Sequence, residues 1–177
     1  VGGNLAPAAP ANDHPATMLA YDATLVAEGP DGDTIIGIDD FFLGLFETSL
    51  AKDQILKEIR LPKPGPGSGG AYLKIERKVG DYAVVGVAIQ LTVENGTVTA
   101  ARIGLTNVAG APMRAKNAEA ALIGNAPTGD ILEKAGQAAA AECEPWSDLR
   151  GSEEYKRDMV RIVTKRAIRK AVERVGA

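Results

Sequence analysis

Residues 84–105, VVGVAIQLTVENGTVTAARIGL, predict a β-hairpin that decides the fold of the chain's second half. Apolar and β-branched residues fill 84–93 and 98–105, which is typical of paired strands. Asn95-Gly96 between them is the strongest short hairpin signal in the chain, because both residues accept the positive φ of a tight turn. The two segments are therefore expected to pair in antiparallel fashion.

The neighbouring segments extend this hairpin into a domain. Residues 71–78 predict a further strand, so we expect a three-stranded antiparallel meander. Three stretches then favour helices, at 114–122, at 130–141 and from Ser152 onward. Helices that follow a meander pack on one face of its sheet, and the predicted class is α+β.

A stretch rich in proline and glycine separates this domain from the front of the chain. Residues 62–70 read PKPGPGSGG, where proline blocks strand pairing and glycine adds backbone freedom, so no regular element should run through them. We therefore predict a first unit over 1–62, a linker over 63–70 and a second unit over 71–177.

The first unit is predicted to begin with a helix over residues 13–20. Asn12 and Asp13 can cap it, and Pro15 suits its first turn because that position needs no backbone donor. Asp39-Asp40 is expected to cap a later short segment. The remaining segments, in chain order, are a strand at 23–29, a turn at 30–33, a strand at 34–38, the capped segment at 41–45 and a strand at 54–61.

Composition is that of an ordinary soluble protein. The chain has 177 residues, of which 45% are hydrophobic and 24% charged, and a formal net charge of −3, which fits one or two domains. No apolar run approaches the roughly 20 residues of a membrane span, and no signal-peptide pattern is visible, so the expected location is the cytoplasm. Cys143 is the only cysteine, which excludes an internal disulfide and a cysteine-ligated iron–sulfur cluster held by this chain alone.

The last helix carries eight of the chain's 20 Lys and Arg residues, between Lys156 and Arg174. Such a run suggests nucleic-acid binding, but the acidic overall balance argues against it and no nucleic-acid partner is expected. Helical spacing instead predicts an apolar face, with the bases largely on the solvated face. The predicted apolar face consists of Tyr155, Met159, Ile162, Val163, Ala167, Ala171 and Val175.

The corner before that helix, residues 148–152, is predicted to be structural. Ser152 is expected to cap the helix, and Gly151 permits a backbone angle that other residues resist. Asp148 and Arg150 are expected to pair across the turn or to reach another part of the domain.

Other chemistry is weakly indicated. His14 is the only histidine, so a histidine-based metal site would need several carboxylates or an outside ligand, and we expect a surface residue. Cys143 has no visible activating base, which predicts a buried or half-buried thiol. No Ser-His-Asp arrangement can be argued, and Trp146 is expected to anchor its loop.

The first residues of the chain suggest a phosphate-binding turn. Gly2 and Gly3 lack a Cβ, so their backbone can bend sharply and present N–H groups to a pyrophosphate at close range. Three motifs in order then resemble one family, the FAD-binding medium subunit of the molybdenum hydroxylases, of the CO dehydrogenase and xanthine dehydrogenase type. The motifs are GGN at 2–4 followed by PAND at 10–13, RKVGDYA at 77–83 and DLRGSEEYK at 148–156.

This resemblance implies a fold and a set of FAD-binding residues. The chain would be the second half of a PCMH-type FAD-binding domain, followed by a domain like the CO dehydrogenase flavoprotein C-terminal domain. The glycines would bind the phosphate and ribityl region, Tyr82 would lie on or beside the isoalloxazine, and Lys74 or Arg77 would offer positive charge. Asp81 is expected to orient the turn through backbone hydrogen bonds. The implied cofactor-binding residues are Gly2, Gly3, Asn4, Asn12, Asp13, Lys74, Arg77, Asp81 and Tyr82.

The family's function implies the partners. Substrate would be oxidised at a molybdenum cofactor on a large subunit, and electrons would pass through two 2Fe-2S clusters on a small subunit to FAD and then to an external acceptor. The family's N-terminal FAD subdomain has no counterpart in these residues, and we expect FAD binding to need it. Pro7 and Ala9 replace hydroxyl residues of the family pattern, which removes cofactor hydrogen bonds. A rival hypothesis is a noncatalytic assembly domain that binds no cofactor.

Overall fold

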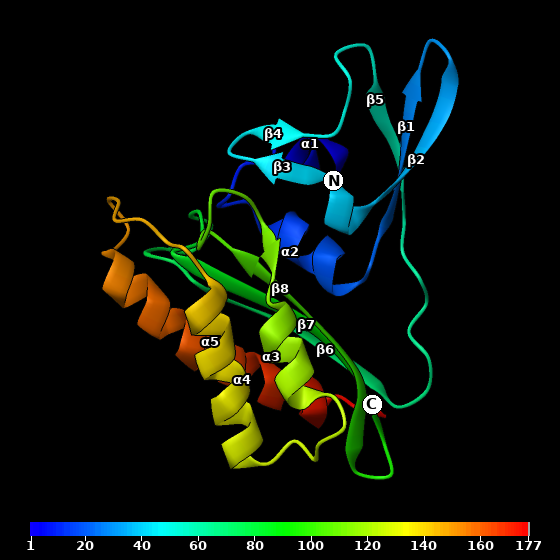
Figure 1. Ribbon diagram of the computed structural model, residues 1–177. Helices are drawn as coiled ribbons and strands as arrows, with labels where there is room; N and C mark the ends of the chain where they lie inside the picture. The colour runs from blue at the N-terminus through cyan, green and yellow to red at the C-terminus, as the bar shows by residue number, and fades with distance from the viewer. Residues whose placement is uncertain (177) are drawn as a thin grey trace.

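A four-stranded antiparallel sheet forms the centre of the second half of the chain (Figure 1). The computed structural model describes residues 1–176. The strands lie in the order β6 (Ser68–Ile75), β7 (Val85–Glu94), β8 (Thr97–Thr106) and β9 (Met113–Arg114). The turn between β7 and β8 has positive φ at both Asn95 and Gly96, as predicted for this hairpin. The expected meander is present, and the two-residue strand β9 adds a fourth member.

Helices cover both faces of this sheet. α3 (Lys116–Leu122), α4 (Gly129–Glu142) and α5 (Glu153–Glu173) lie on one face, while α2 (Asp13–Ala20) from the first unit lies on the other (Figure 1). The core under the three helices includes Ile103 and Leu105, both fully buried. The α+β class predicted from the sequence is confirmed.

The front of the chain forms a second, smaller sheet. Its strands lie in the order β2 (Gly32–Gly37), β1 (Thr24–Gly29) and β5 (Ile55–Arg60), and a separate hairpin joins β3 (Phe42–Gly44) to β4 (Glu47–Thr48). This unit has its own core, whose largest side chains include the fully buried Leu5, Leu25, Ile38 and Phe41.

Two predictions for this unit were wrong. Gly2 and Gly3 do not form a sharp turn but lie in a four-residue helix, α1 (Gly2–Leu5), whose last residue is buried in the core. Residues 41–45 do not form a capped helix: Asp39 and Asp40 lie in a short 3-10 turn (Ile38–Asp40), and the chain then enters β3. The buried Phe41 ring holds this exit by its core packing, which overrides the local cap signal.

The predicted linker is shorter than expected, because β6 already begins at Ser68. A Cβ atom on Gly69 would overlap the carbonyl oxygen of Ala171 in α5. Gly69 therefore serves a close approach of helix to strand, whereas the sequence suggested only a break in regular structure. The division at residues 62–70 into two domains stays a prediction.

The apolar face of α5 agrees in part with the predicted one, because Val163, Ala167 and Ala171 are buried and Met159 and Val175 pack against the core. Tyr155 is exposed, and Lys156 beside it is completely buried, so the bases of this helix do not all lie on the solvated face. The buried residues of α5 are Lys156, Val160, Val163, Thr164, Ala167, Ile168 and Ala171. Lys156 can be buried because its ammonium group has a carboxylate partner, described below.

His14 and Cys143 lie as the sequence predicted, whereas Trp146, expected to anchor its loop, is 38% exposed. His14 is exposed, and the Cys143 thiol is buried, which raises its pKa. The Trp146 ring packs under the ammonium group of Lys156 at 5.2 Å. None of the helices within residues 1–176 is long and apolar enough to cross a membrane.

Candidate functional site

A cavity of about 200 Å³ lies where the loop before α2 meets the turn between β6 and β7. Residues of two segments, 4–13 and 74–82, line this cavity. The two segments are distant in the sequence, since 78 positions separate Asn4 from Tyr82. Six of the nine predicted site residues line this cavity, namely Asn4, Asn12, Asp13, Lys74, Asp81 and Tyr82.

Asp13 is the centre of the hydrogen bonding at this interface. Its Oδ1 accepts a bond of 2.6 Å from the Tyr72 hydroxyl, and its Oδ2 accepts one of 2.9 Å from the Lys74 ammonium. Burial and the bond to Asp13 raise the pKa of Tyr72, so its hydroxyl stays a donor at neutral pH. These bonds tie the start of α2 to strand β6.

The Lys74 ammonium is not a free positive charge. Besides Asp13, it lies 2.9 Å from a carboxylate oxygen of Glu76 and donates to the backbone oxygen of Asp81 at 3.0 Å. The hydrogen bond to Asp13 is the main reason that the pKa of Lys74 is raised. Since two carboxylates face one ammonium, the local charge is not positive, in contrast to the expectation for this side chain.

The capping role predicted for Asn12 needs a correction. Asn12 occupies the N-cap position of α2 but makes no side-chain cap bond. Its side-chain amide instead donates to the backbone oxygen of Asn4 at 2.7 Å, which fixes the loop between α1 and α2. The Oδ1 atom of Asn4 is buried and has no hydrogen-bond partner within the described residues.

The turn that carries Tyr82 is fixed by Asp81. Its Oδ1 accepts the backbone N–H of Tyr82 at 2.8 Å, and its Oδ2 accepts the Arg77 Nε at 3.2 Å. The Tyr82 N–H is the main cause that lowers the pKa of Asp81, so the carboxylate is charged at neutral pH. Gly80 adopts a φ of +81°, and the Tyr82 ring is 55% exposed at the cavity rim.

Three predicted residues lie outside this cavity. Arg77 points into solvent from its pair with Asp81, and its side chain is 53% exposed. Gly2 lines a different cavity of about 400 Å³ together with His14 and residues of β5. Gly3 lies in α1 and lines neither of the two cavities.

Sequence reasoning missed Asn107, which holds the site together, and the partner of Arg150. The side-chain amide of Asn107 donates to the backbone oxygen of Ala83 at 2.7 Å, and its backbone N–H donates to the backbone oxygen of Pro10 at 2.8 Å. Asn107 comes directly after β8 and adopts a positive φ of +62°, which asparagine tolerates better than most residues. The only sequence signal for this role was an asparagine placed directly after an apolar strand. Arg150 lies over the Tyr82 ring; the sequence allowed it to reach another part of the domain but did not indicate this partner.

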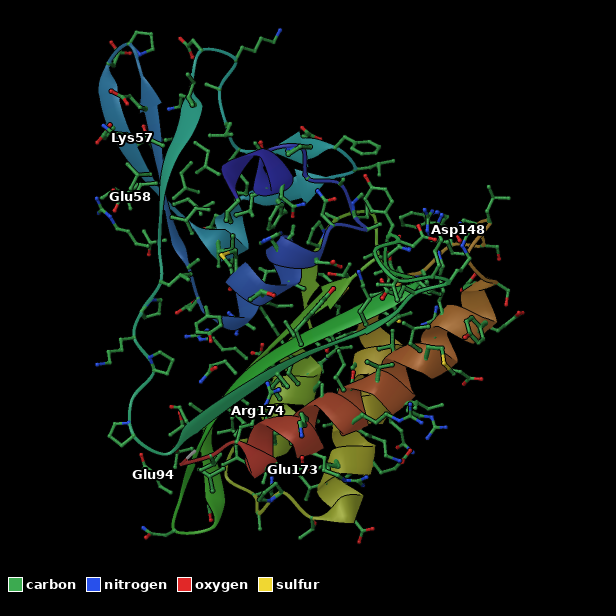
Figure 2. All side chains as sticks on the ribbon, turned by 180° about the vertical axis from the view of Figure 1, so that it is seen from behind. Lys57, Glu58, Glu94, Asp148, Glu173 and Arg174 are labelled. Atoms are coloured by element: carbon green, nitrogen blue, oxygen red, sulfur yellow. The ribbon has the colours of Figure 1, made fainter. Side chains whose placement is uncertain are left out.

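The corner at residues 148–151 packs beside this turn. Figure 2 shows Asp148 at the start of α5, at the opposite end of that helix from Arg174. Asp148 and Gly151 form an isolated antiparallel bridge, with backbone bonds of 3.0 and 3.2 Å. Of the two alternatives expected for these side chains, the structure shows the second, because the Arg150 guanidinium reaches Asp81 and Tyr82 in another part of the domain. Asp148 accepts the ammonium of Lys156 and the backbone N–H of Arg150.

Ser152 caps α5 as predicted, because its hydroxyl accepts the Tyr155 N–H at 3.2 Å. We expect Ser152→Ala to lower the free energy of unfolding by about 1 kcal/mol, since one helix N–H loses its partner. Urea unfolding of the variant checks this, with Glu154→Ala in the same first turn as a control that keeps the cap. Equal unfolding midpoints for Ser152→Ala and the unmodified protein would show that the cap contributes nothing.

Comparison with known proteins identifies the family. Residues 70–171 match the CO dehydrogenase flavoprotein C-terminal domain, and residues 1–64 match the FAD binding domain in molybdopterin dehydrogenase. The chain belongs to the molybdenum hydroxylase flavoprotein family. The fold class and the family predicted from the three motifs are thereby confirmed.

Members of this flavoprotein family with known names cover almost all of the chain. The carbon monoxide dehydrogenase medium chain of Hydrogenophaga pseudoflava is 42% identical over 97% of this chain and 60% of the relative, and that of Afipia carboxidovorans is 40% identical over 98% and 60%. A solved structure of the H. pseudoflava carbon monoxide dehydrogenase, lacking the Mo-pyranopterin moiety of its cofactor, superposes with a TM-score of 0.96 at 45% identity, covering 98% of this chain and 61% of that one. The chain thus spans about 60% of the length of these relatives.

Proposed function

We propose that this chain forms part of the FAD site in the flavoprotein subunit of a molybdenum-containing hydroxylase. The observation that carries the proposal is the cavity that gathers six predicted residues, from the stretches 4–13 and 74–82, at one interface. Residues 1–62 would contribute to the FAD-binding domain and residues 71–177 would form the C-terminal domain, with 63–70 between them.

The cavity fits a part of FAD. Pockets that enclose whole small ligands measure roughly 300–1,000 Å³, so a cavity of about 200 Å³ would hold one section of the dinucleotide. Asn4 lines the cavity and its buried Oδ1 has no partner within the described residues, so a rotation of this side chain would offer an acceptor to a ligand hydroxyl, and the exposed Tyr82 ring offers a flat apolar surface. A ribityl chain and an isoalloxazine edge have these two complementary properties.

Each residue at the cavity would have a positioning role. FAD, when bound, supplies the redox chemistry by accepting electrons and passing them on. The ring of Tyr82 would pack against the flavin, and Asn4 would bind a hydroxyl of the ribityl chain. Lys74 would order the cavity wall through Asp13, since its charge is offset by carboxylates. Gly2 and Gly3 would lie toward the phosphates.

The partners follow from the same proposal. A large subunit would carry the molybdenum cofactor and oxidise the substrate, and a small subunit would pass electrons from its 2Fe-2S clusters to FAD, which an external acceptor reoxidises. The relatives named carbon monoxide dehydrogenase medium chains support this arrangement. This chain alone would be inactive as an oxidoreductase, and its location in the cytoplasm stays a prediction.

An absorbance spectrum tests the proposal against the assembly-domain alternative. The full-length subunit, purified with its partner subunits, is expected to show flavin bands in the blue region of the visible spectrum, and denaturation should release FAD. The 177-residue chain alone, titrated with FAD, is expected to bind it weakly. Absence of flavin from the full-length subunit, with the complex still assembled, would favour the assembly role.

Replacing Tyr82 is expected to perturb the flavin without unfolding the domain. Tyr82→Ala removes a stacking surface that contributes about 1 kcal/mol beyond burial, enough to shift the flavin midpoint potential or lower FAD occupancy. Redox titration and FAD quantification on the full-length subunit measure both effects. Tyr82→Phe keeps the ring and should remain close to the unmodified protein, whereas an unchanged Tyr82→Ala would make this a plain surface tyrosine.

A further inference from the structure

Arg150 contacts the Tyr82 turn in two ways. Its guanidinium carbon lies 5.4 Å from the centroid of the Tyr82 ring, and its Nη2 lies 3.6 Å from Oδ1 of Asp81. A planar guanidinium stacks on an aromatic face while it attracts a carboxylate, so the two contacts suit one group. Arg150 does not line the cavity, and its side chain is only 25% exposed.

The other side of Arg150 is anchored to the start of α5. Its backbone N–H donates to Oδ1 of Asp148 at 2.8 Å, while Oδ2 of Asp148 accepts the ammonium of the buried Lys156 at 2.8 Å. A chain of direct contacts therefore joins Lys156 in α5 to Tyr82 in the turn between β6 and β7. The two segments lie about 70 residues apart in the sequence, and Arg150 is the side chain that joins them.

The Arg150 guanidinium is not satisfied by hydrogen bonds alone. Its Nε is buried and has no hydrogen-bond partner within residues 1–176, and the 3.6 Å separation from Asp81 is too long for a good hydrogen bond. An arginine kept in place with a buried unpaired donor costs stability. The stacking contact of the Arg150 guanidinium with the Tyr82 ring offsets this cost.

We infer that Arg150 is a positioning residue that holds the Tyr82 ring and the Asp81 carboxylate in the orientation needed to pack against the flavin. The inference rests on the proposed function, since it concerns the same flavin contact. It assigns the corner at residues 148–151 a role in the cofactor site, whereas the sequence indicated only a structural corner.

Hydrogen exchange tests the positioning without reference to the flavin. The Tyr82 N–H bonds to Asp81, so loss of Arg150 should open this bond more often. In the FAD-free full-length subunit we expect Arg150→Met to speed exchange of the Tyr82 amide by roughly fivefold, the change that corresponds to one lost cation–π contact. Arg150→Lys should recover part of the protection, because a lysine keeps the charge but not the planar stack.

Two control variants separate positioning from stability. Ser152→Ala removes the cap of α5 without touching Tyr82, and Leu149→Ala changes a neighbour in the same corner that is 93% exposed. Neither should alter exchange at Tyr82. If Ser152→Ala speeds that exchange as much as Arg150→Met does at equal loss of stability, the effect is general loosening and the inference is overturned.

Flavin potentials complete the test. In the FAD-loaded full-length subunit, Arg150→Met should shift the midpoint potential in the same direction as Tyr82→Ala, and the double variant should shift it no further than Tyr82→Ala alone. Additive shifts in the midpoint potential would mean that Arg150 acts independently of Tyr82, which overturns the inference. The inference is also overturned if Tyr82→Ala shifts the midpoint potential and Arg150→Met does not. In both cases the proposed function stands. If Tyr82→Ala itself leaves the flavin unchanged, the flavin contact of the proposed function fails, and the inference fails with it. Should Arg150→Met not fold, Arg150→Lys carries the same comparison.

Discussion

Replacing Gly104 by alanine is expected to lower the free energy of unfolding by about 3 kcal/mol, the upper end of the usual cost of overpacking. Gly104 is buried in β8, and a Cβ atom there would overlap the carbonyl oxygen of Ala16 in α2. The obstacle is helix backbone and not a flexible side chain, so α2 as a whole must move away from the sheet. Because α2 begins at Asp13, this movement would also pull Asp13 from Lys74 at the candidate site.

Urea unfolding of Gly104→Ala measures the effect on stability. Gly110→Ala is a matched control, because Gly110 is exposed and a Cβ atom there would meet nothing within 4 Å. FAD occupancy of the full-length subunit should fall in Gly104→Ala and remain unchanged in the control. An unfolding midpoint equal to that of Gly110→Ala would show that α2 does not pack against β8 as closely as the structure has it.

The parts of the fold that the sequence predicts well are those with local causes. The hairpin turn at Asn95-Gly96 needs only the φ preferences of two adjacent residues, and the two pairs beside it, Glu94 with Thr97 and Val93 with Val98, follow the register that this turn sets. Beyond them the register shifts between Val93 and Thr92. The cap at Ser152 likewise depends on an amide three residues away. Element boundaries failed where a distant helix decided them, as at Gly69 beneath α5.

In the candidate site, too, the sequence predicts local features and misses contacts between distant segments. The family motifs supplied the residues that line the cavity, but not the contacts that hold them, because those contacts join distant segments. Tyr72 looks like any strand residue in the sequence, yet its hydroxyl binds Asp13, 59 positions away. The charge balance at Lys74 was also beyond the sequence, since it depends on which carboxylates the fold brings to the ammonium group.

The burial of Lys156 shows a limit of helical periodicity. Spacing along α5 predicts Val163, Ala167 and Ala171 on the buried face correctly, but it placed Tyr155 inside, whereas its neighbour Lys156 is the buried residue. A buried lysine needs a partner that the helix itself cannot supply. Asp148 and the Trp146 loop supply it from the segment before the helix.

Replacing Lys156 by methionine is expected to lower the free energy of unfolding by about 3 kcal/mol, because it leaves one partner of a buried ion pair without the other. The Lys156 side chain is fully buried, its ammonium lies 2.8 Å from Oδ2 of Asp148, and it also donates to the backbone oxygen of Trp146 at 3.0 Å. Methionine fills nearly the same volume, so the loss reports the missing charge and not a cavity. Arg169→Met, at an exposed position of the same helix, is the matched control and should change little.

A second substitution and a pH series identify the unpaired carboxylate as the cause. Burial acts to raise the pKa of Asp148, but the hydrogen bonds from Lys156 and from the Arg150 N–H outweigh it, so this pKa is lowered from its ordinary value of 3.8. A carboxylate with a lowered folded-state pKa stabilises the fold above its unfolded pKa, and this contribution is lost as the pH falls through the lower folded value. The stability difference between the unmodified protein and Lys156→Met should therefore be full at neutral pH and shrink below the ordinary value. Asp148→Asn added to Lys156→Met should recover part of the lost stability at neutral pH, because it removes the unpaired charge. The ion-pair explanation would be contradicted if the double variant were no more stable than Lys156→Met and the stability difference between the unmodified protein and Lys156→Met did not change with pH.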